Sequence, residues 1–325
     1  MVKVGVIGVG HLGQHHVKHF ASLVNANLIG VYDLNPKRAN EIANQYNVKS
    51  YNSIDALLST CDAVSIVTPT TQHAEVAELC IKMGKHVFIE KPITKTVAEA
   101  NHLLSLTKQN GTVLQVGHIE RLNPALLALE NYVLKPKFIE VHRLAPYTVR
   151  GTEVPVVLDL MIHDIDIILS LVNSTVKSIR ASGVSIMTDS VDIANARIRF
   201  ENGTVANLTS SRIAQNKVRK LKFFQRDMYV TIDFLLGLTE VYRAIDSDTE
   251  ISNTMVTAPL NNNGGQRSIV YEKPSIKKTD ALRLELTNFI ESVQGKAKPI
   301  VDGRAGRDAL EVAANIQKTI IEDIN

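Results

Sequence analysis

Three glycines near the amino terminus constrain the fold of this chain more than any other feature. Gly8, Gly10 and Gly13 form the pattern Gly-x-Gly-x-x-Gly, which follows an apolar run at residues 2–7 and precedes a stretch with helical spacing. In a strand–turn–helix unit such glycines permit a tight turn, close approach of the backbone to a pyrophosphate, and close packing of helix on strand. The helix amino terminus then faces the phosphates. The predicted dinucleotide contacts in this turn are Gly8, Gly10, His11, Leu12 and Gly13.

An acidic residue ends the next predicted strand. Asp33 follows the apolar residues 28–32 and lies about 20 residues after Gly13, where a ribose-binding carboxylate is expected. A carboxylate there favours NAD, because it would repel the 2′-phosphate of NADP. Arg38 is near enough in the sequence to soften that preference, or it is an ordinary solvated helix residue. NAD is therefore the predicted cofactor, and NADP is left open.

Strands and helices continue to alternate through residue 116, which indicates βαβ units and a parallel sheet. The expected helices are 38–46, 74–83 and 96–107, and the expected strands are 63–67, 86–90 and 112–116. We therefore expect a Rossmann domain with a doubly wound parallel sheet over residues 1–119. Thr68 and Pro69 follow one strand, and with His73 they are expected near the nicotinamide ribose.

The sequence Glu90-Lys91-Pro92 ends the strand at residues 86–90. Proline cannot donate to a sheet ladder, so the strand stops there. Lys91 is then placed at the carboxyl edge of the sheet, where open α/β folds bind ligands. A solvated lysine is the alternative. We assign Glu90 and Lys91 to the cofactor site and Lys91 to the substrate site as well.

The second half of the chain reads as an α+β domain over residues 120–303, with a large, open, mostly antiparallel sheet. A polar turn with Arg121 and Asn123 precedes an expected helix at 125–133, and suits either substrate contact or helix capping. Strands follow at 138–144 and in succession between 176 and 271, and residues 261–265 are predicted to be a flexible loop. The final helix, 304–321, is expected to pack back on the first domain.

Residues 156–169 are apolar on all sides of a helix, so that helix should be buried. Its polar side chains Asp159, His163 and Asp166 share one stripe, whereas Asp164 points away from it. Buried ionisable groups must be paired or functional. A structural His–Asp pair and a metal site are alternatives to a catalytic role.

Composition excludes several other classes of protein. The formal charge is +3, from 36 basic and 33 acidic residues, and no basic run carries aromatic residues, so no nucleic-acid partner is expected. Cys61 and Cys80 read as reduced core thiols. No leader is evident, and no apolar run approaches the ~20 residues of a membrane span, which favours a cytoplasmic location. The first-helix residues His11, His15, His16 and His19 are assigned a surface or capping role in preference to a metal site.

With these motifs identified, the chain resembles the Gfo/Idh/MocA family, named for glucose–fructose oxidoreductase and inositol dehydrogenase. The resemblance covers essentially the whole length. It rests on "VIGVGHLG", "HAEVAELCIKMGKHVFIEKPI", "VLDLMIHDIDI" and "DGRAGRDALEVA". It implies a catalytic set of Lys91, Asp159 and His163. The segment "VGHIERLNPAL" resembles the nucleotide-sugar branch, which includes UDP-N-acetylglucosamine 3-dehydrogenases, with Arg121 and Asn123 as substrate residues.

The resemblance implies NAD(P)-dependent oxidation of a secondary hydroxyl. Imidazoles titrate near neutral pH, so His163 is the first choice for the base. Lys91 would stabilise the alkoxide or itself act as base, and Asp159 would orient His163 or the substrate. The alternatives are an inositol or free-sugar dehydrogenase, a non-catalytic NAD(P)-binding regulator, and an imine or bilin reductase. The resemblance also implies a homodimer or homotetramer formed through the second sheet.

Overall fold

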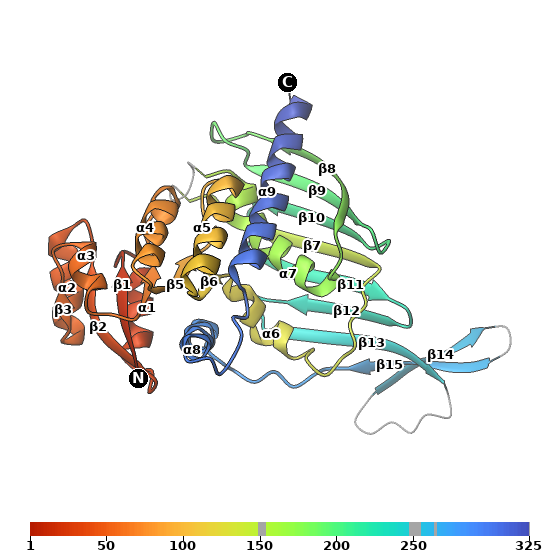
Figure 1. Ribbon diagram of the computed structural model, residues 1–325. Coiled ribbons are helices and arrows are strands. Elements are labelled where there is room, and N and C mark those ends of the chain that lie inside the picture. The colour runs from red at the N-terminus through yellow and green to blue at the C-terminus, as the bar shows by residue number, and fades with distance from the viewer. Residues whose placement is uncertain (149–153, 247–254, 263–264, 325) are drawn as a thin grey trace. The chain divides into compact units, whose positions relative to one another are not determined.

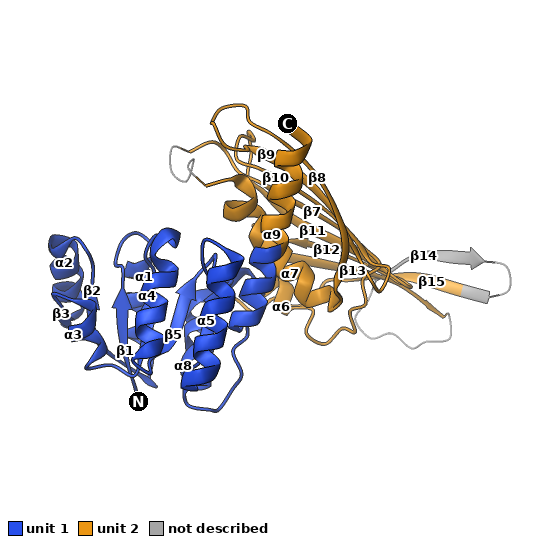
Figure 2. Cartoon of the chain, turned by 45° about the horizontal axis from the view of Figure 1, so that its top comes forward, with its two compact units in different colours: residues 1–122, 280–311 blue, residues 123–279, 312–325 orange. Residues whose placement is uncertain are grey.

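A computed structural model describes residues 1–148, 154–246, 255–262 and 265–324, and the chain forms two compact units. Unit 1 comprises Met1–Leu122 and Asp280–Glu311, and unit 2 comprises Asn123–Thr279 and Val312–Asn325 (Figure 2). None of the helices in the described residues is long and apolar enough to cross a membrane.

Unit 1 contains a six-stranded sheet in the order β3-β2-β1-β4-β5-β6, with every ladder parallel. This confirms the predicted Rossmann topology, in which the order reverses between β1 and β4. Its elements, drawn in Figure 1, are β1 Val2–Ile7, α1 Gly13–Phe20, β2 Ala26–Tyr32, α2 Pro36–Tyr46, β3 Lys49–Ser50, α3 Ile54–Leu58, β4 Ala63–Ile66, α4 Thr70–Lys82, β5 His86–Glu90, α5 Val97–Asn110, β6 Leu114–Gly117 and the 3₁₀ helix η1 Ile119–Leu122.

Local sequence signals explain where these helices begin and end. Asn35 caps α2 and is followed by Pro36, whose fixed φ suits the first helical position. Thr96 and Glu99 form a reciprocal capping box at the start of α5, and Gly111 ends that helix in the left-handed conformation. The start of α2 and both ends of α5 are therefore marked by capping residues that can be identified in the sequence.

Helix α8, Ala281–Val293, belongs to unit 1, although the second domain is predicted from the sequence to span residues 120–303. Phe289 packs edge-on to Phe88 of β5, with ring centroids 5.7 Å apart. The Gln115 side chain also donates to the carbonyl of Glu285 at 3.1 Å. An amphipathic helix pattern does not indicate which sheet the helix will cover, so the sequence could not assign it.

The long helix α9, Gly303–Ile324, begins in unit 1 and continues into unit 2. Its first turn lies close to β6, because Cβ atoms added at Gly303 and Gly306 would come within 2.8 Å of Leu114 and 2.5 Å of Val116. Helix 304–321 is predicted from the sequence to pack on the first domain, and its part up to Glu311 lies in unit 1.

Unit 2 contains a sheet whose nine strands, in the described residues, run in the order β14-β15-β13-β12-β11-β7-β10-β9-β8. The β7–β10 ladder is parallel and the other ladders among the described residues are antiparallel, which confirms the predicted mostly antiparallel sheet. Its elements are α6 Pro124–Leu127, β7 Phe138–Leu144, the π-helix η2 Val157–Met161, α7 Ile162–Val172, β8 Val176–Val184, β9 Ile193–Phe200, β10 Val205–Ser211, β11 Val218–Gln225, β12 Met228–Asp233, β13 Leu238–Asp246, β14 Met255–Asn262 and β15 Gly265–Glu272.

Two local predictions for unit 2 are wrong. The expected helix at 125–133 is the four-residue α6. The expected flexible loop at 261–265 overlaps a hairpin, because Asn261 and Asn262 end β14 and Asn262 pairs with Gly265 of β15; residues 263–264 lie outside the described residues. Asparagine and glycine are turn formers, but their pattern does not show how close to the turn the ladder continues.

Candidate active site

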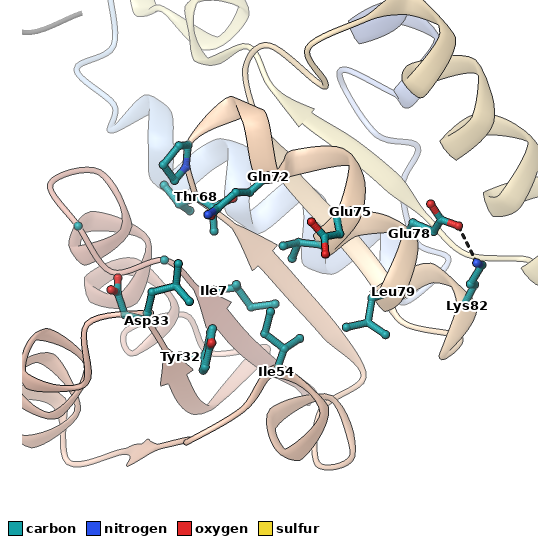
Figure 3. Close-up of a pocket in the computed structure, with 16 residues that line it drawn as sticks. Ile7, Tyr32, Asp33, Ile54, Thr68, Gln72, Glu75, Glu78, Leu79 and Lys82 are labelled. Atoms are coloured by element: carbon teal, nitrogen blue, oxygen red, sulfur yellow. Dashed lines mark ion pairs between the residues drawn. The ribbon is translucent and has the colours of Figure 1, made fainter.

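A pocket of about 570 Å³ lies in unit 1 at the carboxyl ends of β1, β2 and β4. In Figure 3, Tyr32 and Asp33 lie on one side of it and Gln72 and Glu75 of α4 on the other. The lining residues are Ile7, Gly8, Gly10, Tyr32, Asp33, Leu34, Ile54, Val67, Thr68, Pro69, Gln72, Glu75, Val76, Glu78, Leu79 and Lys82. This is the sheet edge at which open α/β folds bind ligands.

The glycine-rich turn has the close packing that its sequence predicts. Gly8 has φ +87°, a conformation that L side chains rarely adopt. A Cβ at Gly13 would lie 1.9 Å from the Gly8 carbonyl oxygen, whereas a Cβ at Gly10 would meet nothing within 4 Å. Gly8 and Gly13 therefore shape the turn, and Gly10 leaves space beside it for a ligand.

The Asp33 carboxylate lies at the rim of the pocket and also holds the turn. Its two oxygens accept hydrogen bonds of 2.8 Å from the backbone N–H groups of Val9 and Asn35. Arg38 is directed elsewhere. Its guanidinium donates to the Val9 carbonyl at 3.0 Å and to the Gln14 side chain at 3.0 Å, and pairs with Glu41 at 2.9 Å. The pocket lining does not include Arg38, so its contacts give no support to a role with a 2′-phosphate.

The residues after β4 supply a polar group to the pocket. The buried Thr68 hydroxyl lines it and has no hydrogen-bond partner among the described residues. A buried hydroxyl of this kind ordinarily has a partner, so a ligand that carries hydroxyl groups would satisfy it. Together with Gly8, Gly10 and Asp33, Thr68 gives the pocket the groups that a dinucleotide requires, and the residues present fit NAD.

Several predicted cofactor residues lie outside this pocket. His11, Leu12, Gly13, Arg38, His73, Glu90 and Lys91 do not line it. The α4 residues that line it, including Gln72, Glu75 and Leu79, were missed, because the sequence does not show which helix face meets the pocket. Pro69, Gln72, Glu75 and Leu79 follow one another at intervals of three or four residues, so they share one helix face. That periodicity is the sequence signal that could have identified them.

Lys91 is half-buried and follows β5, which pairs with β4 through Ile66 and Ile89. It therefore follows the strand next to β4, whose carboxyl end leads to Thr68. The preceding residue, Glu90, accepts a hydrogen bond from the Lys91 backbone N–H at 3.2 Å. Burial alone would raise the pKa of Glu90, but His16, the Lys91 charge and this N–H outweigh it and hold the pKa below its usual value.

The first-helix histidines do not all have the expected surface or capping role. His11 and His15 are exposed, whereas His16 and His19 are buried. The His16 ring lies 2.9 Å from the Ser65 hydroxyl through Nδ1 and 3.1 Å from Glu90 through Nε2. The surface prediction is wrong for His16 and His19, because the sequence of one helix does not show which of its side chains face other elements of the unit.

In unit 2, Asp159 belongs to the π-helix η2 and His163 to the first turn of α7. Both are half-buried, whereas Asp166 is buried, with 1% of its surface exposed. Asp164 points away from this stripe, as predicted, and makes a bidentate pair with Arg143 of β7, at 2.8 Å for both bonds. Sequence reasoning did not anticipate the change of helix type between Asp159 and His163.

Asp159 lines a small cavity of about 150 Å³ within unit 2. The cavity is also lined by Ala145, Pro146, Thr148, Leu160, Arg212 and Lys217. Lys217 adds positive charge beside the predicted catalytic carboxylate, whereas the buried Arg212 pairs with Asp192 at 4.0 Å. Arg212 and Lys217 were missed, because they lie more than fifty residues after Asp159, on the segment that leads into β11.

The turn before α6 has the contacts expected for capping. Asn123 caps α6, with its side-chain oxygen accepting from the Ala125 N–H at 3.1 Å. Arg121 donates to the carbonyl of Ile300 at 3.1 Å within unit 1. The substrate roles of Arg121 and Asn123 stay predictions.

The chain matches two sequence families in succession. Residues 2–118 match the oxidoreductase family with an NAD-binding Rossmann fold (GFO_IDH_MocA), and residues 145–228 match the GFO/IDH/MocA C-terminal domain. Over 320 residues the chain is 37% identical to a UDP-N-acetylglucosamine 3-dehydrogenase of Acidithiobacillus ferrooxidans, which covers 98% of this chain and 97% of that protein.

The chain belongs to the Gfo/Idh/MocA oxidoreductase family. As a member of this family it is an NAD-dependent dehydrogenase that acts on CH–OH groups. A solved structure of the Acidithiobacillus ferrooxidans enzyme superposes with a TM-score of 0.89 at 35% identity, over 100% of this chain and 99% of that one. A myo-inositol 2-dehydrogenase of Thermotoga maritima is 25% identical over 99% of this chain and 97% of its own length.

Proposed function

We propose that this Gfo/Idh/MocA enzyme oxidises the C3 hydroxyl of UDP-N-acetylglucosamine to a ketone, with NAD as the oxidant. The observation that carries the proposal is the similarity to the Acidithiobacillus ferrooxidans dehydrogenase over both units, at 37% identity. The motif residues Lys91, Asp159 and His163 add to it, because a family member that kept only a binding role would not need all three.

The reaction removes a proton from the substrate oxygen and a hydride from carbon, and NAD, when bound, accepts the hydride. We propose that His163 takes the proton as general base. Lys91 donates a hydrogen bond to the same oxygen and stabilises the charge that develops on it. If Lys91 is a neutral amine at that moment, it can take the proton itself. Asp159 orients His163 or the substrate.

Substrate recognition draws on the unit 2 residues beside Asp159. A nucleotide sugar carries a diphosphate, and the cationic side chain of Lys217 is suited to it. Arg121 and Asn123 are further proposed substrate residues.

The second candidate is an inositol or free-sugar dehydrogenase, which the similarity to the Thermotoga maritima enzyme favours. The two candidates differ in whether a nucleotide is required. The experiment is to incubate purified protein and NAD with UDP-N-acetylglucosamine, N-acetylglucosamine or myo-inositol and to follow NADH absorbance. Rapid NADH formation with the nucleotide sugar alone supports the proposal. Turnover of myo-inositol but not of the nucleotide sugar would replace it with the second candidate.

We further propose that the protein is a homodimer or homotetramer formed through the unit 2 sheet. Along β9, alternate residues are buried and exposed, so one face of the sheet remains open. A row of aromatic rings crosses five strands, with centroids 4.5–6.0 Å apart. Its members are Phe138, Phe224, Tyr229, Tyr242 and Tyr271. Light scattering of the Phe224→Lys variant tests this, because an unchanged mass would contradict it.

A cytoplasmic location is also proposed. Cys61 and Cys80 are both buried and free, and burial raises the pKa of the Cys61 thiol to about 11. Reduced, unreactive thiols suit a reducing compartment. Fractionation of cells that express the native protein tests this location, and recovery outside the cytosolic fraction would contradict it.

A further inference from the structure

Two buried histidines contact the residues on either side of Lys91. His16, on α1, approaches Glu90, and His73, on α4, approaches Pro92. Each has 1% of its surface exposed, so neither is a solvent-facing side chain. A buried imidazole is costly unless its nitrogens are hydrogen-bonded, and here each of the four nitrogens lies within 3.1 Å of an oxygen atom.

The contact between His16 and Glu90 is part of a chain that ends at the Lys91 backbone. Ser65 of β4 lies 2.9 Å from Nδ1 of His16, and Glu90 lies 3.1 Å from Nε2. The other Glu90 oxygen accepts the Lys91 N–H at 3.2 Å. Gly117 of β6 leaves room for this carboxylate, because a Cβ there would lie 2.9 Å from a Glu90 oxygen.

His73 connects the two loops that end β4 and β5. Its Nδ1 lies 2.9 Å from the Pro92 carbonyl oxygen, and its Nε2 lies 2.9 Å from the Thr68 carbonyl oxygen. Burial lowers the pKa of His73, while both carbonyls and the Glu90 charge oppose that shift. In either protonation state the ring donates to at least one carbonyl and fills the space between the loops. One of those loops lines the NAD pocket through Thr68, and the other carries Lys91.

We propose that His16 and His73 are positioning residues for Lys91. Together they fix the backbone on both sides of this lysine and set its place relative to the NAD pocket of unit 1. The inference rests on the proposed catalytic role of Lys91. Its energetic basis is that a misplacement of about 1 Å at a reacting group costs on the order of 10²-fold in rate. Cofactor binding should be unaffected, because Lys91 does not line the NAD pocket.

The first test compares substitutions at His16 with a matched control on the same helix. His16→Leu removes both hydrogen bonds, and His16→Gln keeps a donor for Glu90. His15→Leu changes an exposed neighbour. We expect kcat to fall about 10–100-fold in His16→Leu, with the Kd for NADH and the KM unchanged. We expect His16→Gln to recover most of the loss and His15→Leu to match the wild type. Wild-type kcat in His16→Leu would overturn the proposal.

Two further variants change other residues that contact the neighbours of Lys91. They serve as the test if His16→Leu does not fold. Gly117→Ala pushes the Glu90 carboxylate from its place, and His73→Gln keeps one donor between the two carbonyls. We expect Gly117→Ala to show the same loss of kcat at unchanged NADH affinity, and His73→Gln a smaller one. Equal losses of kcat, NADH affinity and melting temperature in all variants, His16→Gln included, would indicate a merely structural role and overturn the proposal.

A second measurement needs no substrate and separates this inference from the proposed function. The acylation rate of Lys91 by an N-hydroxysuccinimide ester is measured by peptide mass spectrometry, with exposed Lys95 as internal reference. Faster labelling of Lys91 in His16→Leu and in Gly117→Ala, with Lys95 unchanged, supports the positioning role even if the wild type oxidises none of the sugars. An unchanged Lys91 rate in both variants would contradict it.

Discussion

The carboxylate of Asp33 accepts a 2.8 Å hydrogen bond from the backbone N–H of Val9, so the acid that is expected to bind ribose also holds the glycine-rich turn. Arg38 reaches the carbonyl of the same residue at 3.0 Å. Asp33 and Arg38 therefore both hold Val9, and Asp33 alone of the two lines the pocket.

We predict that Asp33→Ala weakens NADH binding about 10–100-fold, because hydrogen bonds to a charged group contribute about 1.5–3 kcal/mol. NADPH affinity should fall less, since the substitution also removes repulsion of the 2′-phosphate. Fluorescence titration with both nucleotides measures the two effects. Asp55→Asn, a change at an exposed acid outside the pocket, is the control. An Asp33→Ala protein with wild-type NADH affinity would refute this ribose assignment.

Two glycines of the same turn should respond differently to alanine. A Cβ at Gly13 would lie 1.9 Å from a backbone oxygen, so Gly13→Ala should lower both the melting temperature and NADH affinity. A Cβ at Gly10 meets nothing within 4 Å, so Gly10→Ala should keep the wild-type melting temperature while weakening NADH binding, because Gly10 lines the pocket. Thermal unfolding with and without NADH separates the two. Equal melting temperatures for both variants without NADH would contradict the packing argument.

Sequence reasoning predicted the Rossmann sheet because its signals are local. Gly8, Gly10 and Asp33 have fixed spacings that follow from how a strand, a turn and a helix meet a dinucleotide. The contacts of His16, by contrast, are not local. It is buried against Ser65 and Glu90, which lie 49 and 74 positions away in the chain. No periodicity in one helix shows that contact.

The same limit applies to the rest of the site. The α4 lining of the pocket and the placement of α8 in unit 1 depend on packing between distant segments. The sequence allowed Arg38 to be either a residue that tolerates NADP or a solvated helix residue. In the structure it contacts Val9 and Gln14, which neither interpretation included. Motifs with local spacing are therefore predictable, whereas the side of an element that faces a ligand is not.

The buried pair of Arg143 and Asp164 should stabilise unit 2 next to His163. Both side chains are at most 3% exposed, and two bonds of 2.8 Å join them. Arg143→Met leaves a buried carboxylate without this partner and should cost about 3–5 kcal/mol of unfolding free energy. The double variant Arg143→Met, Asp164→Leu should recover much of that loss. Urea denaturation measures both. A double variant less stable than Arg143→Met would contradict the assignment.

Asp192 should make stability depend on pH at the acid end. Burial opposes its ionisation, but hydrogen bonds from the N–H groups of Ile186, Met187 and Thr188 and from the Thr188 hydroxyl lower its pKa to about 2. A folded pKa below the unfolded value of about 3.9 gives stability that is fully present above pH 4 and is lost as the pH falls toward 2.

Asp192→Asn removes that titration. The variant should have a lower melting temperature at pH 7, and its melting temperature should change less than that of the wild type between pH 4 and pH 2. Differential scanning fluorimetry across this range measures both, with Asp189→Asn as a control at a nearby acid for which no such hydrogen bonds are described. Parallel curves for wild type and Asp192→Asn would show that Asp192 is not the group responsible.

We propose that Lys91 acts on the hydroxyl that the enzyme oxidises, and turnover of UDP-N-acetylglucosamine by Lys91→Met beside the wild type tests this role. NADH formation gives kcat, and NADH fluorescence gives cofactor affinity in the same preparations. We predict that Lys91→Met binds NADH as the wild type does and loses at least about 10³-fold in kcat, because it loses both a hydrogen-bond donor and a charge at the reacting oxygen. A Lys91→Met enzyme that keeps most of the wild-type kcat would contradict the account.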